Sequence, residues 1–203
     1  MRDLSRRLML AAFAALALTA CNKGGGGKVT ADEMTMGDPK AKVTLIEYAS
    51  VACPHCARFN NDVFPELKKK YIDTGKVYYV SREALTGDPT VAAAGFLLAR
   101  CGGKDKYFEI TDAIYRAQED MYKSGDVHGT LLRVAQSAGM NEDQFTKCIT
   151  DADAIKALND RVTKSAQQDN VDGTPFFIVN GKKWKEGEVS MADVDAELQP
   201  LVK

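Results

Sequence analysis

The sequence predicts an α/β domain interrupted by a long helical insertion. Strand and helix patterns alternate before residue 88, whereas the next strand-like segment, 176–179, follows only after a continuous helical pattern over 88–169. Alternating segments of this kind favour a sheet covered by helices. We therefore expect residues 41–87 and 170–203 to form one α/β domain, with residues 88–169 inserted into it.

The N-terminal part of this domain is predicted to be strand, helix and strand. Residues 43–48 form an apolar run typical of a buried strand, and Cys53-Pro54-His55-Cys56 follows shortly after it. Apolar residues at helical spacing occupy 59–71, and Thr74-Gly75 marks a turn before the strand-like segment 77–81. The sequence thus places two cysteines at the turn from a strand into a helix.

Local signals divide the insertion into several helices. Asp88-Pro89 predicts a helix start, because aspartate caps free N–H groups and proline fits the first turn. Asn141, with Gln144 three residues later, matches a capping box. Together with the apolar spacing, these signals predict helices at 88–100, 105–122, 127–138, from 141 onward, and at 154–166.

The C-terminal part is predicted to be a hairpin followed by a helix. Asn180-Gly181 is a strong two-residue turn, which should return Lys183-Trp184 alongside the strand at 176–179. Ser190 is placed to cap a last helix, and Pro200 disfavours its continuation.

The N-terminus has the pattern of an export signal. Three arginines, Arg2, Arg6 and Arg7, precede an apolar run at 8–18 that is too short to span a membrane. The run ends in Leu18-Thr19-Ala20-Cys21, which resembles a bacterial lipobox. We expect residues 1–20 to be a lipoprotein signal peptide and Cys21 to carry the lipid, although a plain signal peptide with a coincidental cysteine is the alternative. Either the general or the twin-arginine export route fits these arginines.

Residues 21–40 are expected to be a flexible tether, which contains four consecutive glycines at 24–27, and an N-terminal segment. The 203-residue chain has a formal net charge of −1 and fits a single domain. It shows no basic patch with interleaved aromatic residues, so we expect no nucleic-acid partner. We predict a periplasmic or otherwise extracytoplasmic monomer that contacts a membrane only through the lipid.

The Cys53-Pro54-His55-Cys56 stretch predicts redox chemistry. A cysteine at a helix N-terminus meets free N–H groups and the positive end of the helix dipole, which favour the thiolate that attacks disulfides. We expect Cys53 to be the exposed nucleophile and Cys56 the buried resolving thiol. Pro54 suits the first helical turn, and the charge or N–H donor of His55 is expected to stabilise the Cys53 thiolate. No cofactor is needed beyond the Cys53–Cys56 disulfide itself.

Two further cysteines, Cys101 and Cys148, remain. In an exported protein an even remainder favours a second, structural disulfide, while two buried free thiols are the alternative. Zinc binding is not expected, because the chain has only His55 and His128 as histidines and these two cysteines lack close-spaced partners.

The order of these features resembles the DsbA family of bacterial extracytoplasmic thiol:disulfide oxidoreductases, over nearly all of the chain after the signal. The resemblance rests on Cys53-Pro54-His55-Cys56, on Glu47 six residues earlier, on the helical insertion, and on Gly173-Thr174-Pro175 before an apolar strand and an Asn-Gly hairpin. It implies a thioredoxin-like fold with an inserted helical domain. It further implies that the Thr174-Pro175 bond is cis and faces the redox pair.

The resemblance gives Glu47 the position of a buried acidic residue beneath the active site. There it would exchange protons with Cys56, with Arg82 as a possible counter-charge. The alternative is that Glu47 faces solvent at a sheet edge.

Three functions are compatible with this sequence. The first is donation of the Cys53–Cys56 disulfide to folding exported proteins, followed by resetting through a membrane redox partner. The second is disulfide reduction or isomerisation on the same fold. Thr174 occurs before the proline in isomerase-type relatives, but residues 22–40 are too short for their usual dimerisation region. The third is a non-catalytic binding or chaperone module.

Overall fold

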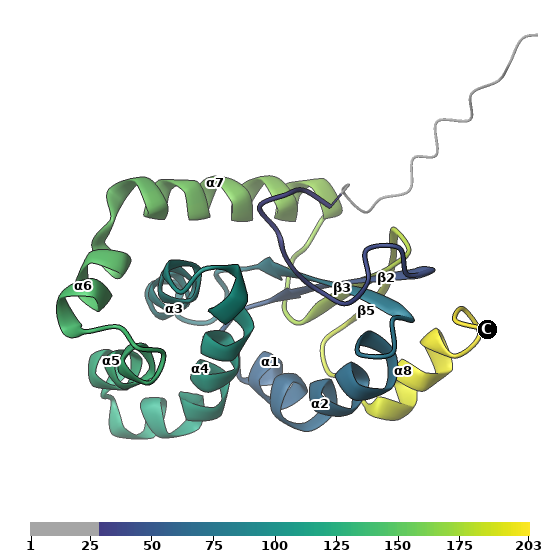
Figure 1. Ribbon diagram of the computed structural model, residues 1–203, viewed down its shortest axis with the longest axis horizontal. Helices are drawn as coiled ribbons and strands as arrows, with labels where there is room; N and C mark the ends of the chain where they lie inside the picture. The colour runs from purple at the N-terminus through teal and green to yellow at the C-terminus, as the bar shows by residue number, and fades with distance from the viewer. Residues whose placement is uncertain (1–28) are drawn as a thin grey trace, which may run out of the picture.

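The computed structural model describes residues 29–203 as a five-stranded sheet flanked by helices, with a helical region beside it (Figure 1). The expected signal peptide, Cys21 and the glycine tether lie outside the described residues. The fold is the expected one, a thioredoxin-like α/β fold with an inserted helical region, and that prediction is confirmed.

The sheet brings together strands from both ends of the chain. Its order is β1-β3-β2-β4-β5, in which β2 and β3 are parallel and the other neighbours are antiparallel. The strands are β1 (Met34–Met36), β2 (Val43–Ala49), β3 (Val77–Glu83), β4 (Phe176–Val179) and β5 (Lys182–Glu186). Because β4 pairs antiparallel with β2, the loop that follows β2 and the loop that precedes β4 meet at the same end of these two strands.

Alternation along β2 separates the two faces of the sheet. Val43 and Leu45 pack in one cluster with α2 and α8, whereas Ile46 and Tyr48 pack in a second cluster on the other face. The helices α1, α2 and α8 lie below the strands in Figure 1, and α7 lies above them. Glu47 therefore points toward the face that carries the active-site helix.

A single long helix begins directly after Cys53 and includes Cys56, but it is not regular. It consists of α1 (Pro54–Arg58), a π-helical turn η1 (Phe59–Val63), α2 (Phe64–Leu67) and a second π-helical turn η2 (Lys68–Ile72). Pro65 lacks an N–H and cannot donate to the preceding turn, which accounts for the widened turn before it. The apolar spacing marks this helix only from Phe59, but the placement of Cys53 at a helix N-terminus predicts a start at Pro54, where the helix begins.

The insertion contains five helices, two of which end at the second disulfide. They are α3 (Pro89–Cys101), α4 (Lys104–Ser124), α5 (Val127–Ser137), α6 (Glu142–Thr150) and α7 (Ala152–Asp169). Asp88 caps α3, and the capping box of Asn141 and Gln144 is formed at α6, as the sequence predicts. Cys101 and Cys148 form a disulfide, with Cα atoms 5.9 Å apart, that joins α3 to α6.

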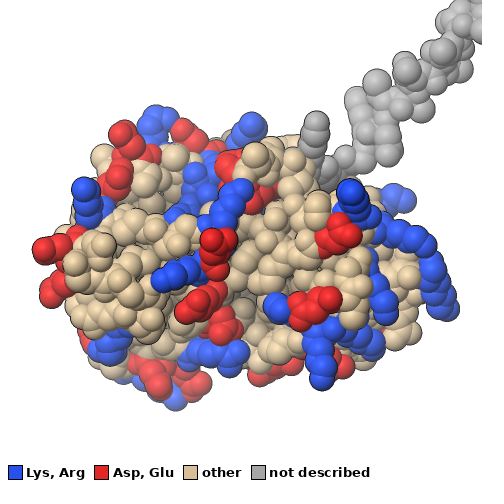
Figure 2. Space-filling model, in the orientation of Figure 1, with Lys and Arg blue, Asp and Glu red and all other residues tan. Residues whose placement is uncertain are grey.

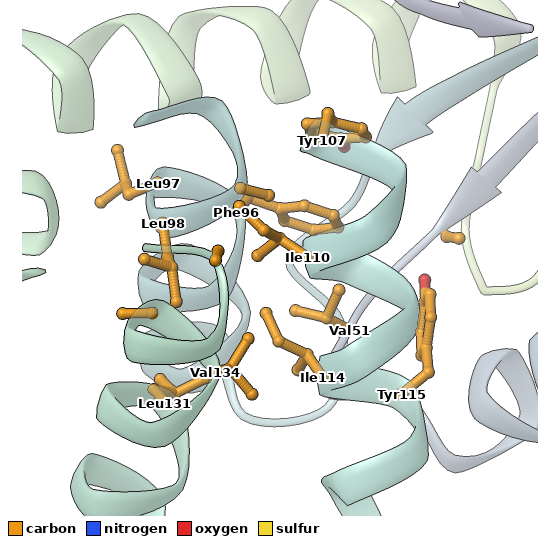
Figure 3. Packing of buried hydrophobic residues seen from close by; sticks show 14 of the residues in the cluster. Val51, Phe96, Leu97, Leu98, Tyr107, Ile110, Ile114, Tyr115, Leu131 and Val134 are labelled. Carbon is orange, nitrogen blue, oxygen red and sulfur yellow. The ribbon is translucent and has the colours of Figure 1, made fainter. Parts of the chain in front are cut away.

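The core of the insertion lies between α3, α4 and α5. Figure 3 shows Phe96 of α3 and Ile110 and Ile114 of α4 meeting between these helices, with Val51 between the two isoleucines. Tyr115 lies on the other side of α4 and points toward the strands. The helix α4 therefore contributes to two interfaces, one within the insertion and one with the sheet domain.

The C-terminal hairpin and helix are where the sequence places them. Asn180 and Gly181 form the turn with φ values of 47° and 79°, and Ser190 caps α8 (Met191–Leu198). Trp184 on β5 packs against Phe177, their ring centroids 5.7 Å apart.

One strand was not expected from the sequence. The sequence predicts a tether and an N-terminal segment over residues 21–40, yet Met34–Met36 forms β1 and pairs with β3 at the sheet edge. Glu33 pairs with Arg82 of β3, and Val29 packs against the sheet. A strand of three residues, Met-Thr-Met, carries too little alternation to be recognised by its sequence pattern.

Charged side chains are scattered over a face that is otherwise largely formed by uncharged residues (Figure 2). Over the helical insertion basic and acidic side chains are interspersed, whereas basic side chains outnumber acidic ones at the end of the face that carries α8 (Figure 2). Within residues 29–203, none of the helices combines the length and apolar character that crossing a bilayer requires. The same residues contain no group of three or more His, Cys, Asp or Glu side chains arranged to hold a metal ion.

Candidate active site

Cys53 stands at the N-terminus of α1, at the end of a tight turn from β2. Its N–H donates to the carbonyl of Ser50 at 3.0 Å, and its own carbonyl accepts the first helical hydrogen bond, from Ala57. Pro54 follows as the first helical residue, where its missing N–H is no loss. Cys53 keeps 7% of its surface exposed, whereas Cys56, one turn into the helix, has none.

The surroundings of Cys53 favour its thiolate. The side chain of Cys56 makes the largest contribution to a lowered pKa of Cys53, and burial opposes it. The Thr174 side chain and the backbone N–H groups of Cys56 and His55 lower the pKa further. Together these donors lower the pKa of Cys53 to about 5. A thiolate held by several donors at a helix N-terminus is both a good attacking group and a good leaving group near neutral pH.

Cys56 has the opposite character. Burial raises its pKa well above the ordinary value, and the charges of Cys53 and Glu47 raise it further. Its sulfur accepts a hydrogen bond from the N–H of Ser50 at 3.5 Å. The pair therefore consists of one accessible thiolate and one buried thiol that stays protonated.

This asymmetry gives a direct prediction for alkylation. Reduced protein treated with iodoacetamide near pH 6 should be modified at Cys53 well before Cys56, and the rate should rise with pH through about 5, the pKa of Cys53. Peptide mapping by mass spectrometry identifies the modified residue. Faster modification of Cys56, or a rate that rises only near pH 9, would contradict the assignment of Cys53 as the nucleophile.

The loop before β4 forms a wall beside Cys53. The Thr174–Pro175 peptide bond is cis, and the carbonyl of Thr174 lies 3.5 Å from the sulfur of Cys53. The pairing of β4 with β2 explains this contact between residues so far apart in sequence. The Thr174 hydroxyl in turn bonds to the hydroxyl of Thr86, which follows β3.

The sequence did not single out three residues at the site, which are Ser50, Thr86 and Gln118. Ser50 donates from its hydroxyl to the carbonyl of Thr86 at 2.8 Å and so joins the loops after β2 and β3. Gln118 of α4 donates to the carbonyls of Val51, at 2.8 Å, and Cys53, at 3.3 Å. These residues act on the backbone of the cysteine turn, and no sequence pattern announces such a contact.

His55 serves the site differently from the expected way. Its backbone N–H is among the donors that lower the pKa of Cys53, but its ring lies half-exposed with Nδ1 at 2.9 Å from Glu188 and 2.6 Å from Arg58. The ring therefore belongs to a surface cluster of His55, Arg58 and Glu188 on one side of α1.

Glu47 lies beneath the cysteine pair and is 4% exposed, so the alternative of a solvent-facing edge residue is wrong. The hydroxyl of Tyr79 donates to its Oε2 at 2.5 Å. Burial, partly offset by this hydrogen bond, raises the pKa of Glu47 to about 7. It also lines a cavity of about 330 Å³ that includes Tyr79 and Tyr115. Glu47 can thus gain or lose a proton at neutral pH.

Arg82 is not the counter-charge of Glu47, and that expectation is wrong. In the parallel pairing of β2 and β3, Glu47 is opposite Ser81 and Tyr48 is opposite Arg82. Arg82 therefore lies on the other face of the sheet, where it pairs with Glu33 and with Asp169 of α7. Adjacent positions on a strand point to opposite faces, which separates the two charges.

The raised pKa of Glu47 has a consequence for stability. Because the folded state holds this proton more tightly than the unfolded state, the stabilisation is complete below about pH 4.5 and is lost as the pH rises through about 7. The shift corresponds to roughly 3 kcal/mol. Relative to wild type, Glu47→Gln should therefore gain about this free energy of unfolding between pH 4 and pH 8, as measured by urea unfolding of both proteins with the active site reduced.

Glu109→Gln, which replaces an exposed glutamate of α4, is the matched control and should show no such trend. If the difference in free energy of unfolding between wild type and Glu47→Gln stayed constant across this pH range, Glu47 would not titrate as described.

Comparison with known proteins agrees with this geometry. The family model described as Thioredoxin matches residues 29–199. The chain is 34% identical over 155 residues to a Rickettsia bellii protein named "Putative protein-disulfide oxidoreductase", covering 76% of this chain but only 59% of that protein. It is 25% identical over 171 residues to "Disulfide bond formation protein D" of Bacillus subtilis, covering 83% and 75% of the two chains.

A solved structure extends the comparison to the fold. The chain superposes on Wolbachia pipientis α-DsbA1 with a TM-score of 0.76 and 26% identity, over 86% of this chain and 92% of that one. Since the family model spans nearly all of the described residues and the cysteine pair lies where the fold holds its redox site, the chain is a DsbA-like member of the thioredoxin family.

Proposed function

We propose that the protein is an extracytoplasmic thiol:disulfide oxidoreductase that donates the Cys53–Cys56 disulfide to folding exported proteins. The observation that carries the proposal is the unequal acidity of the two thiols, about 5 for the pKa of Cys53 against a strongly raised pKa for Cys56. An enzyme whose reduced form is stabilised as a thiolate gives up its disulfide readily.

The size of this effect favours oxidation over reduction. The pKa of Cys53 is lowered from 9.0 to about 5. At pH 7 only the part of this shift that lies below pH 7, about two pKa units, stabilises the reduced form, which amounts to roughly 3 kcal/mol. For a two-electron couple this raises the reduction potential by about 60 mV. The hydroxyl of Thr174 contributes to this shift, so in this chain the threonine before the proline supports disulfide donation.

The transfer proceeds in two exchanges. A substrate thiolate attacks the sulfur of Cys53, a mixed disulfide forms, and Cys56 leaves and takes up a proton, for which the neutral carboxyl of Glu47 is the nearby acid. A second substrate thiolate then attacks the substrate sulfur of the mixed disulfide and expels the Cys53 thiolate. The substrate loses two electrons, which remain on the Cys53–Cys56 dithiol until an oxidised membrane partner removes them.

Location and anchoring belong to the same proposal. The basic, then apolar N-terminus and the cysteine at its end support export and lipid attachment at Cys21. Growth with labelled fatty acid should label the wild-type protein and leave Cys21→Ala unlabelled. Label in both proteins, or in neither, would overturn the anchor.

The proposed activity is tested in cells that lack their own extracytoplasmic disulfide oxidase. The wild-type gene should restore disulfide formation in an exported reporter protein, and Cys53→Ser should not. The purified oxidised protein should likewise oxidise a reduced unfolded protein. Reduction of insulin without any oxidation would favour the reductase function. Loss of all redox activity in Cys53→Ser, with binding of the unfolded protein kept, is required before a non-catalytic module could be favoured.

A further inference from the structure

A groove between α1 and α4 lies directly beside the active-site cysteine. It has a volume of about 490 Å³, and its walls include Pro54 and Arg58 from α1 and Arg116, Glu119, Tyr122 and Lys123 from α4. None of its lining residues comes from the loop that holds Thr174 or from α8. The α1–α4 groove is therefore a separate surface from the wall formed by the cis-proline loop.

Hydrogen bonds fix the position of α4 relative to the turn that carries Cys53. Tyr122 donates from its hydroxyl to the carbonyl of Ala52 at 3.3 Å, and Gln118 donates to the carbonyl of Cys53 at the same distance. A peptide joined to Cys53 would thus meet α4 at a fixed position, without rearrangement of the helix.

Tyr122 gives the groove an apolar contact. Its side chain is 41% exposed, and within residues 29–203 it is one of only two large hydrophobic residues that are exposed. Its hydrogen bond to the Ala52 carbonyl holds the ring in place, so little conformational entropy is lost when another chain packs against it. Aromatic side chains of this kind are frequent contact points in protein interfaces.

The charges of the groove are mainly basic. Arg58, Arg116 and Lys123 line it, against the single carboxylate of Glu119. The acidic partners of the two arginines, Glu188 and Asp112, lie outside the groove, and only Lys123 is paired within it. With these partners the local charges balance, so a carboxylate of a bound segment would share the N–H donors of the groove's arginine and lysine side chains with them, whereas a lysine of that segment would meet like charges.

We propose that the α1–α4 groove binds the polypeptide on one side of the substrate cysteine, and that it favours segments with an apolar side chain next to acidic residues. This inference rests on the proposed function, since it assigns a substrate preference to the same site. Packing on Tyr122 supplies contact area, and the basic side chains select acidic over basic segments through association rate and complementarity.

Two peptides test the preference. Each has two cysteines and one phenylalanine, and they differ only in that one carries glutamates and the other lysines beside the first cysteine. The measured quantity is kcat/KM for oxidation of each peptide by the oxidised protein, with a small neutral dithiol as a reference for the intrinsic reactivity of the disulfide. We expect the glutamate peptide to be preferred about threefold to tenfold at low salt, and less at high salt.

Matched variants locate the preference in the groove. Lys123→Glu should abolish or invert it, whereas Lys156→Glu on α7 should leave it unchanged, although Lys156 forms an equally exposed i,i+4 ion pair with Asp160. Tyr122→Ala should lower kcat/KM for both peptides about threefold to tenfold, and Tyr122→Phe, which keeps the ring but loses its hydrogen bond to Ala52, should lower it less. The small dithiol should react at the wild-type rate with Lys123→Glu and Lys156→Glu.

The outcomes separate this inference from the function on which it rests. Equal values of kcat/KM for the two peptides, or equal effects of Lys123→Glu and Lys156→Glu on the peptide preference, overturn the proposal that the groove binds the substrate. They leave the proposed function intact. If neither peptide is oxidised while the small dithiol is, the proposed function fails and the groove proposal fails with it.

Discussion

Cys56→Ser should convert the protein from a catalyst into a trap for its substrates. Cys53 keeps its position at the helix N-terminus and still attacks substrate disulfides, but Cys56, which would attack Cys53 in the mixed disulfide and expel the substrate thiolate, is missing. Release then depends on external thiols, whereas an oriented internal thiol has a far higher effective concentration. We expect mixed disulfides to persist roughly 1,000-fold longer or more.

Non-reducing electrophoresis measures the trap. In extracts of cells that export the variant, covalent adducts should appear that disappear on treatment with reductant. Cys53→Ser is the control and should form almost none, because Cys56 is fully buried and its pKa is raised. Abundant adducts in Cys53→Ser, or none in Cys56→Ser, would reverse the assigned roles of the two cysteines.

Removal of the second disulfide should have the largest effect on stability. Cys101 and Cys148 are separated by 47 residues, and a bond that closes a loop of this length contributes about 4 kcal/mol in the chain-entropy model. We therefore expect Cys101→Ala/Cys148→Ala to lower the free energy of unfolding by up to about this amount, as measured by urea unfolding. The bond lies within the insertion and contacts neither active-site cysteine, so the alkylation rate of Cys53 should stay the same.

The wild-type protein provides the control for this measurement. When a strong reductant opens both disulfides, its free energy of unfolding should approach that of the double variant. A loss below about 1 kcal/mol in the variant would show that the bond does not stabilise the insertion as described.

Sequence reasoning worked where the signal is local. Asp88-Pro89, Asn141 with Gln144, and Asn180-Gly181 each act on backbone groups two or three residues away, so the corresponding elements lie where they were predicted. The cysteine pair is equally local, since its reactivity depends on the helix that it begins. These signals were sufficient to place the strands, the insertion and the redox turn in order.

The contacts that sequence reasoning missed join residues from different elements. Whether Arg82 meets Glu47 depends on which face of β3 it occupies, and that depends on the register between β2 and β3. Ser50 and Gln118 donate to backbone carbonyls of other loops, and the hydroxyl of Thr86 bonds to that of Thr174, so their residue types carry no visible pattern. The short strand β1 exists only because β3 offers a free edge to it.

The position of β4 in the sheet also determines when a newly made chain becomes competent. Cys53 and Cys56 emerge early in synthesis, but the strand beside β2 and the Thr174 carbonyl next to Cys53 belong to the last part of the chain. Until then Cys53 lacks the contribution of Thr174 to its lowered pKa and the wall that positions a partner. A chain that stops before β4 would carry the cysteines without this wall, so full reactivity reports that synthesis has reached the C-terminal strands.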